Sequence, residues 1–203
     1  MKKEHYRIIK QVIDRVLAVA ALLVLWPLLL LIAIIIKLDS KGPVIFKQKR
    51  VGNHKKHFNI YKFRTMRTDT PIDMPTHLLA DPNAFLTKSG RILRKTSLDE
   101  LPQLFNIAKG DMVIVGPRPA LWNQYDLIEE RDKYGANDIL PGLTGWAQIN
   151  GRDELEIPVK AKLDGEYVER MSFAFDIKCM VGTFSSVLHA EGVVEGGTGQ
   201  LKK

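Results

Sequence analysis

A continuous apolar run near the N-terminus is the most prominent pattern in the chain. Residues 16–36 read VLAVAALLVLWPLLLLIAIII without a charged side chain, and the chain is polar and basic from Lys37 onward. About 20 apolar residues in a helix can cross a bilayer. A signal peptide would have a shorter apolar region followed by small residues for cleavage. Because Lys37-Leu38-Asp39-Ser40 follows here, we expect a membrane segment that is not cleaved off.

Pro27 lies near the centre of this run, where its missing N–H and its ring bend a helix. A spanning helix is oriented by an excess of Lys and Arg on its cytoplasmic side. Here the flanks are balanced, with Lys2, Lys3, Arg7, Lys10 and Arg15 before the run and Lys37, Lys41, Lys47, Lys49 and Arg50 after it. We therefore predict a re-entrant helix hairpin over residues 1–37, broken near Pro27. A kinked spanning helix is the alternative.

The segment from Val44 to Met66 has the pattern of a β-hairpin. Its β-branched and aromatic residues flank Gly52-Asn53, which is typical of a tight turn between two strands. His54 and His57 have a spacing that can ligate a metal. Because they lie among lysines beside the turn, we interpret them as part of a solvated loop.

The remaining pattern is mainly helical. Short helices are predicted over residues 86–95 and 101–109, the second stopped by Gly110, followed by an amphipathic helix over 121–134. Residues 68–82 are expected to form an irregular loop, and the glycine-punctuated segment 140–152 to be extended or looped. Helix returns over 154–188. Its broad apolar face is expected to pack in the core, and the alternative is that it lies on the membrane surface. The face comprises Phe173, Phe175, Ile177, Met180, Val181, Phe184 and Leu188.

The predicted fold class is therefore α+β and mostly α-helical. We expect a membrane segment over residues 1–37, a cytosolic domain over 38–194, and a disordered glycine-rich tail over 195–203. A net charge of +7 suits nucleic acid, an anionic membrane or a phosphorylated substrate. The single cysteine, Cys179, excludes an internal disulfide and fits a small buried residue on a helix.

Several common catalytic motifs are missing from the sequence. It has no G-x-G-x-x-G, no G-x-x-x-x-G-K-[ST], no G-x-S-x-G and no Asp-x-Asp. These absences weigh against dinucleotide-binding enzymes, P-loop enzymes, serine hydrolases and glycosyltransferases that hold a metal–nucleotide through Asp-x-Asp.

The acidic pair Asp99-Glu100, in the run TSLDELPQL, is the main candidate for chemistry. Ser97 and Glu100 have the spacing of a helix-capping box, but Pro102 would then forfeit a hydrogen bond inside the helix. A helix that begins at Leu98 or Asp99 avoids this loss. Asp99 would then lie beside unpaired N–H groups that also attract phosphate, and Mg²⁺ could offset the two adjacent carboxylates.

Basic residues near the acidic pair and elsewhere indicate a phosphate site. Three of them, Arg91, Arg94 and Lys95, precede the pair directly, and Arg118 is held between two prolines in VGPRP. Lys62 and Arg64 lie in the second predicted strand, and Arg152 ends GLTGWAQINGR. From the residues alone, we expect a membrane-associated, phosphate-handling, Mg²⁺-dependent protein.

The ordered set of motifs IFKQKRVG, FNIYKFRTM, RKTSLDELPQLFNIAKGDM, VGPRPA and LPGLTGWAQINGR closely resembles the small monotopic phosphoglycosyl transferases of bacteria. These enzymes initiate the synthesis of capsules, exopolysaccharides, O-antigens and protein glycans. The resemblance covers nearly the whole chain. It implies a re-entrant helix broken near a proline, a cytosolic helical domain with a small β-hairpin, and interfacial amphipathic helices. Trp26 departs from the family, in which Ser often precedes this proline.

The resemblance also implies a mechanism. Asp99 would attack the β-phosphorus of a UDP-sugar and release UMP, and polyprenyl phosphate, such as undecaprenyl phosphate, would then accept the sugar phosphate. Glu100 would assist with proton or metal handling, and both carboxylates would bind Mg²⁺. The phosphate contacts would come from Lys62, Arg64, Arg94, Arg118 and Arg152.

The implied location is the cytoplasmic face of the bacterial inner membrane. The sugar and the oligomeric state, including a homodimer, are left open. A different hypothesis is a non-catalytic membrane adaptor that binds acidic partners through its basic surface. Because that hypothesis leaves Asp99-Glu100 and Arg118 without a purpose, we expect an enzyme with no nucleic-acid partner.

Overall fold

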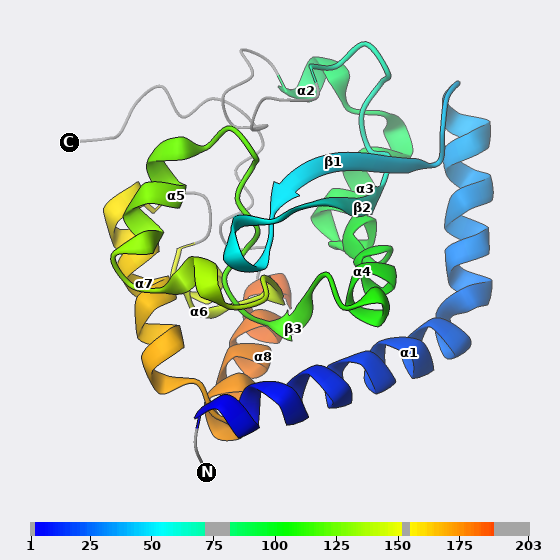
Figure 1. Cartoon of the computed structure of the whole chain (residues 1–203). Helices are drawn as coiled ribbons and strands as arrows, with labels where there is room; N and C mark the ends of the chain where they lie inside the picture. Colours follow the sequence, from blue (N-terminus) through cyan, green and yellow to red (C-terminus); the bar gives the residue numbers. More distant parts are fainter. Residues whose placement is uncertain (1–2, 72–81, 152–154, 189–203) are drawn as a thin grey trace.

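The computed structural model describes residues 3–71, 82–151 and 155–188. One long helix, α1 (Lys3–Asp39), runs along the edge of a domain in which shorter helices surround two small sheets (Figure 1). The predicted α+β, mostly helical class is confirmed. The tail over residues 195–203 lies outside the described residues, and so does most of the predicted loop over 68–82.

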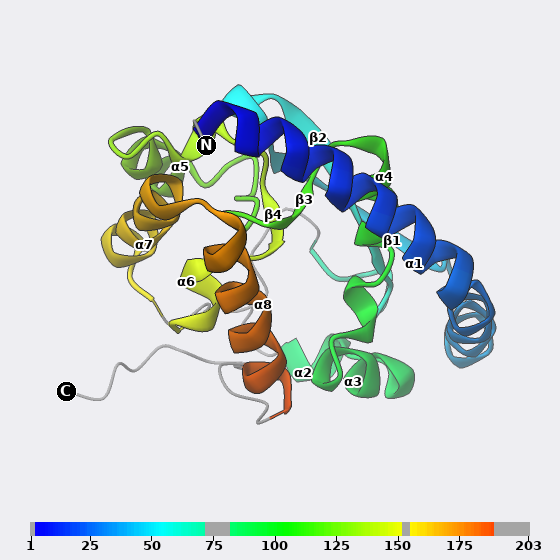
Figure 2. The same cartoon turned by 90° about the horizontal axis from the view of Figure 1, so that it is seen from below.

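Helix α1 is continuous through Pro27. Its ribbon follows the lower edge of Figure 1 and then turns upward, and Figure 2 shows the second arm nearly end-on. The helix is long and apolar enough to cross a membrane, and only 17% of its most apolar 18-residue window is buried. A core helix of a soluble protein would be mostly buried. The structure thus supports a membrane-associated helix, whereas the break at Pro27 and the re-entrant hairpin are not confirmed.

The predicted β-hairpin is confirmed. Strands β1 (Ile45–Val51) and β2 (His57–Phe63) pair antiparallel, from Ile45 opposite Phe63 to Val51 opposite His57. The connection is longer than two residues, because the 3₁₀ turn η1 (Asn53–Lys55) follows Gly52. His54 Nδ1 lies 3.1 Å from Asp138 Oδ1 at the surface, consistent with a solvated loop.

A second, parallel sheet was not predicted. Strands β3 (Val113–Val115) and β4 (Gly142–Thr144) have three residues each, too few for a period to be visible in the sequence. A Cβ atom on Gly142 would clash with the backbone of Gly116, so glycine permits this close approach of the two segments.

The described helices after the hairpin are α2 (Pro82–Phe85), α3 (Lys88–Lys95), η3 (Leu98–Glu100), α4 (Gln103–Lys109), α5 (Tyr125–Asp132), η4 (Ala136–Asp138), α6 (Trp146–Ile149), α7 (Ile157–Arg170) and α8 (Phe173–Leu188). The helices predicted over residues 86–95, 101–109 and 121–134 correspond to α3, α4 and α5 with shorter bounds, whereas α2, η4 and α6 were not predicted as helices. Gly110 ends α4 with φ +88°, as predicted for a left-handed helix stop.

The helix predicted over residues 154–188 is two helices, α7 and α8, separated at Met171-Ser172. Ser172 caps the second one, since its Oγ accepts a 3.3 Å hydrogen bond from Phe175 N and its carbonyl accepts one from Asp176 N. The segment 140–152, predicted as extended or looped, contains both β4 and the short helix α6.

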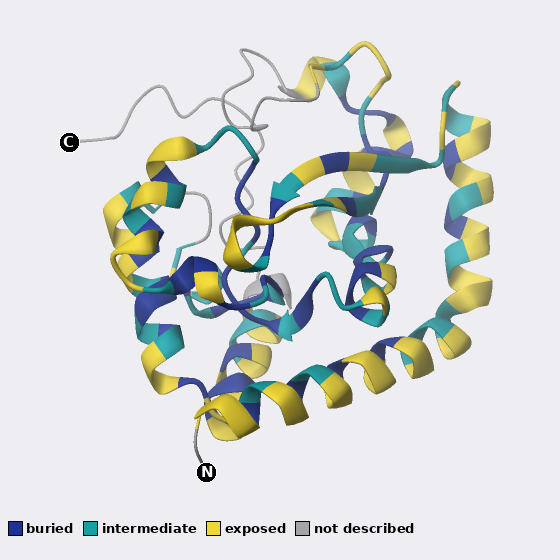
Figure 3. Ribbon diagram, in the orientation of Figure 1, coloured by how far each residue is buried: buried dark blue, intermediate teal, exposed yellow. Residues whose placement is uncertain are grey.

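Helix α1 contributes to three of the four apolar clusters that form the core of the described residues. Tyr6 joins α7 and α8, Ala18 packs with β2 and α4, and Ile32 and Ile36 pack with Phe63 and Leu93. Figure 3 shows this arrangement as a buried stripe on an otherwise exposed helix. The first 37 residues therefore share their packing with the rest of the chain, and a domain boundary at residue 37 stays a prediction.

A buried polar cluster ties the first arm of α1 to α8. Lys10 Nζ lies 2.6 Å from Asp176 Oδ2 and 3.1 Å from Asp14 Oδ2. Tyr6 and Tyr167 donate hydrogen bonds of 2.8 and 2.7 Å to the Asp176 carboxylate. We call these five residues the α1–α8 cluster. Buried charges need such pairing, so the cluster fixes where α1 sits on the domain.

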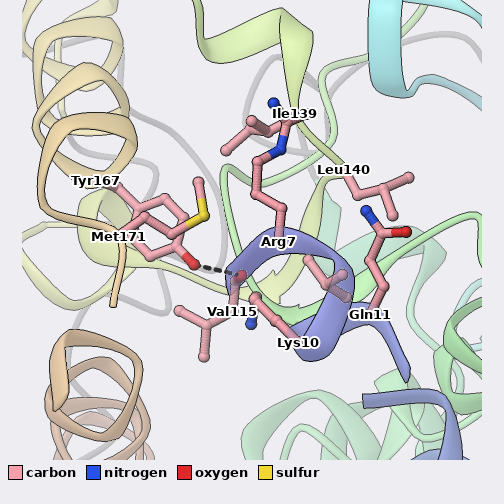
Figure 4. A pocket seen from close by; sticks show the side chains of 9 residues that line it. Arg7, Lys10, Gln11, Val115, Ile139, Leu140, Tyr167 and Met171 are labelled. Carbon is pink, nitrogen blue, oxygen red and sulfur yellow. Dashed lines mark hydrogen bonds between the residues drawn. The ribbon is translucent and has the colours of Figure 1, made fainter. Parts of the chain in front are cut away.

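A small cavity of 20 Å³ borders this cluster. Figure 4 shows Lys10 and Tyr167 at its wall, with the Tyr167 hydroxyl donating to the Val115 carbonyl. The volume suits about one water molecule. The acidic pair is not among the lining residues, so this cavity is separate from the candidate site.

Candidate active site

The segment between α3 and α4 positions the acidic pair. Ser97 adopts a left-handed conformation (φ +55°), and the 3₁₀ turn Leu98–Glu100 follows it. Ser97 makes no side-chain cap, and Pro102 precedes the first residue of α4, where it forfeits no helical hydrogen bond. The helix was predicted to begin at Leu98 or Asp99 with Pro102 in its first turn, but only a 3₁₀ turn begins at Leu98, and the α-helix begins at Gln103, directly after Pro102.

Asn106 fixes the orientation of this segment against the hairpin. Its side-chain oxygen accepts a 2.9 Å hydrogen bond from Tyr61 N, and its amide nitrogen donates at 2.8 Å to Asn59 O. In this way the Asn106 amide completes the free edge of β2. The acidic pair is thereby held beside Lys62, which lies on the same strand.

Glu100 is the centre of an ion-pair cluster. Its Oε1 atom accepts hydrogen bonds from Lys62 Nζ at 2.7 Å and from Arg118 at 2.8 Å. The Glu100 side chain is 20% exposed. Strand β2, the turn η3 and the proline-bounded loop after β3 thus bring together three residues that were predicted from separate motifs.

The charges of this cluster offset one another. Burial alone would raise the pKa of Glu100, but Arg118 and Lys62 together hold that pKa below its usual range. Burial lowers the pKa of Lys62, against the opposing effect of Glu100. Glu100 is therefore ionised and is already paired with two cations.

Asp99 has a different environment from its neighbour. The residue is 8% exposed, and no described residue donates a hydrogen bond to its carboxylate. Burial raises the pKa of Asp99, while the charges of Lys62, Arg94 and Arg118 act in the opposite direction. Asp99 is thus a carboxylate within the field of three cations, with its oxygen atoms free to react or to bind a ligand.

Two of the predicted phosphate contacts have other partners in the structure. Arg94 donates from Nε to Thr65 Oγ1 at 2.9 Å, although it lies near enough to Asp99 to influence its pKa. Arg64 is buried and donates to the carbonyl and hydroxyl oxygens of Ser40, at 2.7 and 2.8 Å, where α1 ends. Arg152 lies outside the described residues.

The donor set for a metal ion is small. The described residues contain no group of three or more His, Cys, Asp and Glu that could hold one. Mg²⁺ needs only one or two carboxylates when phosphates and water complete its shell. The free carboxylate of Asp99 fits that role, whereas Glu100 already offsets Lys62 and Arg118.

One buried polar residue of this segment was missed by the sequence analysis. Gln103, the first residue of α4, is fully buried, and neither polar atom of its amide has a hydrogen-bond partner among the described residues. Its position four residues after Asp99 in DELPQ was the available signal. The interpretation of that run as a helix start drew attention to Pro102 instead.

Comparison with known proteins relates the whole arrangement to one family. Residues 5–190 match the model of the family described as bacterial sugar transferase. The chain is 42% identical over 186 residues to the uncharacterized sugar transferase EpsL of Bacillus subtilis, covering 92% of this chain and 90% of that protein.

Other relatives carry more specific names. Identity is 42% over 179 residues with the undecaprenyl-phosphate glucose phosphotransferase of Komagataeibacter xylinus, and 43% over 183 residues with the UDP-glucose:undecaprenyl-phosphate glucose-1-phosphate transferase of Escherichia coli. The matches cover 83% and 85% of this chain but only 34% and 38% of those longer proteins. The extent of the family match and the high identities show that the chain belongs to the bacterial sugar transferase family.

Proposed function

We propose that this chain is a phosphoglycosyl transferase that moves a sugar-1-phosphate from a UDP-sugar to a polyprenyl phosphate, such as undecaprenyl phosphate. The observation that carries the proposal is the Asp99 carboxylate, buried and without a hydrogen bond from the described residues, close to Lys62, Arg94 and Arg118. The names of the relatives support the same reaction class.

The proposed reaction has two steps at one phosphorus atom. An oxygen of Asp99 attacks the β-phosphorus of the UDP-sugar, the bond from that phosphorus to the bridging oxygen breaks, and UMP leaves with the bond electrons. An oxygen of the lipid phosphate then attacks the same phosphorus, and the bond to Asp99 breaks to restore the carboxylate. A covalent intermediate divides a difficult transfer between two anions into two easier steps.

The cations and Glu100 have distinct parts in this proposal. Lys62 and Arg118 offset the negative charge that gathers around the phosphoryl group, where preorganised donors are most effective. Glu100 holds these two side chains in place through the 2.7 and 2.8 Å bonds. This arrangement leaves Asp99 as the nucleophile rather than as the partner of Lys62 or Arg118.

We further propose that Asp99 is the protein ligand of a Mg²⁺ ion that enters with the nucleotide. When bound, the ion would neutralise diphosphate charge beside a carboxyl group whose pKa is raised by burial. Chelation by EDTA should stop UMP release, and added Mg²⁺ should restore it. Full turnover in EDTA would contradict the metal assignment.

The exposed apolar residues support a monotopic attachment to the cytoplasmic face of the bacterial inner membrane. Figures 1 and 2 show that α8 begins beside the N-terminal turns of α1. Helix α8 exposes five large apolar residues, Phe173, Ile177, Met180, Val181 and Phe184. Apolar helix faces of this kind lie in the membrane interface. A re-entrant α1 predicts that a cysteine introduced at Lys3 is labelled only from the cytoplasm, and labelling from outside would contradict it.

The decisive variant is Asp99→Asn, assayed with a panel of UDP-sugars and undecaprenyl phosphate by UMP release. We expect turnover to fall at least about 10³-fold, since an amide cannot replace the attacking carboxylate. Mass spectrometry of the unmodified enzyme, given donor without the lipid, should find the phospho-sugar adduct at Asp99. Asp126→Asn, at an exposed position on α5, is the matched control. Appreciable turnover by Asp99→Asn would contradict the proposal.

The adaptor hypothesis is not favoured. Its main support was the basic charge, but Lys62 and Arg118 are paired with Glu100 beside the reactive carboxylate. The names of the relatives describe transferases.

A further inference from the structure

The buried face of α4 carries two amide side chains, of which one is hydrogen-bonded and the other is not. Asn106 and Gln103 are both fully buried. Asn106 uses its oxygen and its nitrogen to complete the edge of β2. Neither Oε1 nor Nε2 of Gln103 has a hydrogen-bond partner among the described residues. Most buried polar groups in proteins are satisfied, so Gln103 needs an explanation.

The unsatisfied amide of Gln103 is a cost to the folded protein. Burying an amide without partners is unfavourable, whereas an apolar side chain of similar shape would be neutral or stabilising at the same place. Residues that lower stability in this way are found at functional sites. A group that partners Gln103 during the reaction would offset this cost.

The course of the chain places Gln103 on the side of the acidic pair. The hydrogen bonds from Leu101 N to Leu98 O (3.3 Å) and from Leu104 N to Leu101 O (3.0 Å) continue the helical path from η3 into α4. These bonds join residues three apart, as in a 3₁₀ helix, so residue i+3 lies over residue i and residue i+4 lies on an adjoining part of the same turn. Gln103 lies three residues after Glu100 and four after Asp99.

Of these two carboxylates, only Asp99 is available to the amide. Glu100 Oε1 already accepts from Lys62 and Arg118, whereas the Asp99 carboxylate accepts no hydrogen bond from the described residues. A carboxylate without a partner can rotate and present either oxygen. Attack on phosphorus requires one oxygen to be held in line with the breaking bond.

We propose that Gln103 is a positioning residue whose amide N–H donates to one oxygen of the Asp99 carboxylate when the donor substrate is bound. The other oxygen is then directed at the β-phosphorus. A neutral amide can orient the nucleophile and leave its negative charge intact. A lysine or arginine in the same place would neutralise that charge. This inference rests on the proposed transferase reaction and adds a residue to it.

The test uses the full chain in lipid nanodiscs and the variant Gln103→Met, which keeps the length of the side chain but cannot form hydrogen bonds. We expect kcat for UMP release to fall about 10- to 100-fold, as for the loss of a hydrogen bond to a charged group. KM for the UDP-sugar should change by less than about twofold, because binding is not affected. Tm should stay equal or rise, because an unsatisfied amide has been removed.

Asn106→Leu is the contrasting variant. It removes an amide that is fully bonded to β2, so Tm should fall. Its kcat per folded molecule should stay unchanged. If Gln103 had a purely structural role, Gln103→Met would likewise lower Tm and leave kcat per folded molecule unchanged. If Gln103→Met is not recovered in folded form, Gln103→Leu takes its place in the assay.

Either of two results would overturn the inference, namely a kcat within about twofold of the unmodified enzyme, or a loss of kcat matched by a loss of Tm. The proposed function would fail in a different way. The unmodified enzyme would then release no UMP and form no adduct. An active unmodified enzyme, an inactive Asp99→Asn and a fully active Gln103→Met would remove only the role of Gln103.

Discussion

At the scale of single residues, the two adjacent carboxylates of the site are unequal. Glu100 is paired twice, while Asp99, its neighbour in the sequence, is not hydrogen-bonded by any described residue. A sequence shows two acidic residues and cannot say which one is neutralised, because Lys62 lies 38 positions away and Arg118 lies 18 positions away. The sequence could predict candidate residues that the structure brings together, Lys62, Glu100 and Arg118, but not this difference between the two carboxylates.

The variant Glu100→Gln tests the different roles of Glu100 and Asp99. Without the Glu100 charge, Lys62 and Arg118 would turn to Asp99 and pair with the nucleophile. We expect UMP release to fall by about tenfold or more, and the free energy of unfolding to fall by about 1–3 kcal/mol. Enzyme assays and thermal unfolding measure the two effects. Glu129→Gln, at an exposed site on α5, should change neither, and an unaltered Glu100→Gln enzyme would disprove the assignment.

At the scale of elements, the connection of α1 to α8 is the feature least accessible from the sequence. Lys10 and Asp176 are 166 positions apart, and each reads as an ordinary surface charge in its own segment. The β-hairpin and the ends of α3 and α4 could be predicted, because their signals are local, such as Gly52-Asn53 and Gly110. Pairings across long separations leave no such signal.

A double-mutant cycle on Lys10 and Asp176 measures the strength of this connection. Asp176→Asn should lower the free energy of unfolding by about 3–5 kcal/mol, because Lys10 stays buried with less compensation. The double variant Lys10→Met with Asp176→Asn should cost less than the sum of the two single changes. Lys133→Met, which removes an exposed pair with Glu130, is the control and should cost at most about 1 kcal/mol. Strict additivity would show that the pair contributes no coupling.

At the scale of the whole molecule, α1 and α8 form the candidate membrane face. The sequence could predict an apolar face for the last helix, but could not decide between core and membrane surface. The structure divides it, since Phe175 and Cys179 are buried while Phe173 and Phe184 are exposed. Which side chains of α8 are buried depends on the turn at Ser172, because this turn sets the direction of α8 relative to α7.

The double variant Phe173→Asp with Phe184→Asp tests this face. Two carboxylates at the membrane interface should reduce binding to liposomes and lower UMP release from lipid-embedded acceptor, with Tm changed by less than about 3 °C because both side chains are exposed. Tyr125→Asp, at an exposed aromatic position on α5, is the matched control and should bind as the unmodified protein does. Equal binding by all three proteins would exclude α8 from the interface.

The packing of α1 also limits how this protein can be prepared. The helix covers Ile60, Ile107 and Met112 with its first arm, and Phe63 and Leu93 with its second. Truncation of the anchor to obtain a water-soluble fragment would uncover an apolar strip along the remaining domain. Such a fragment should precipitate or require detergent, so purification has to keep the anchor and supply a lipid-like environment for it.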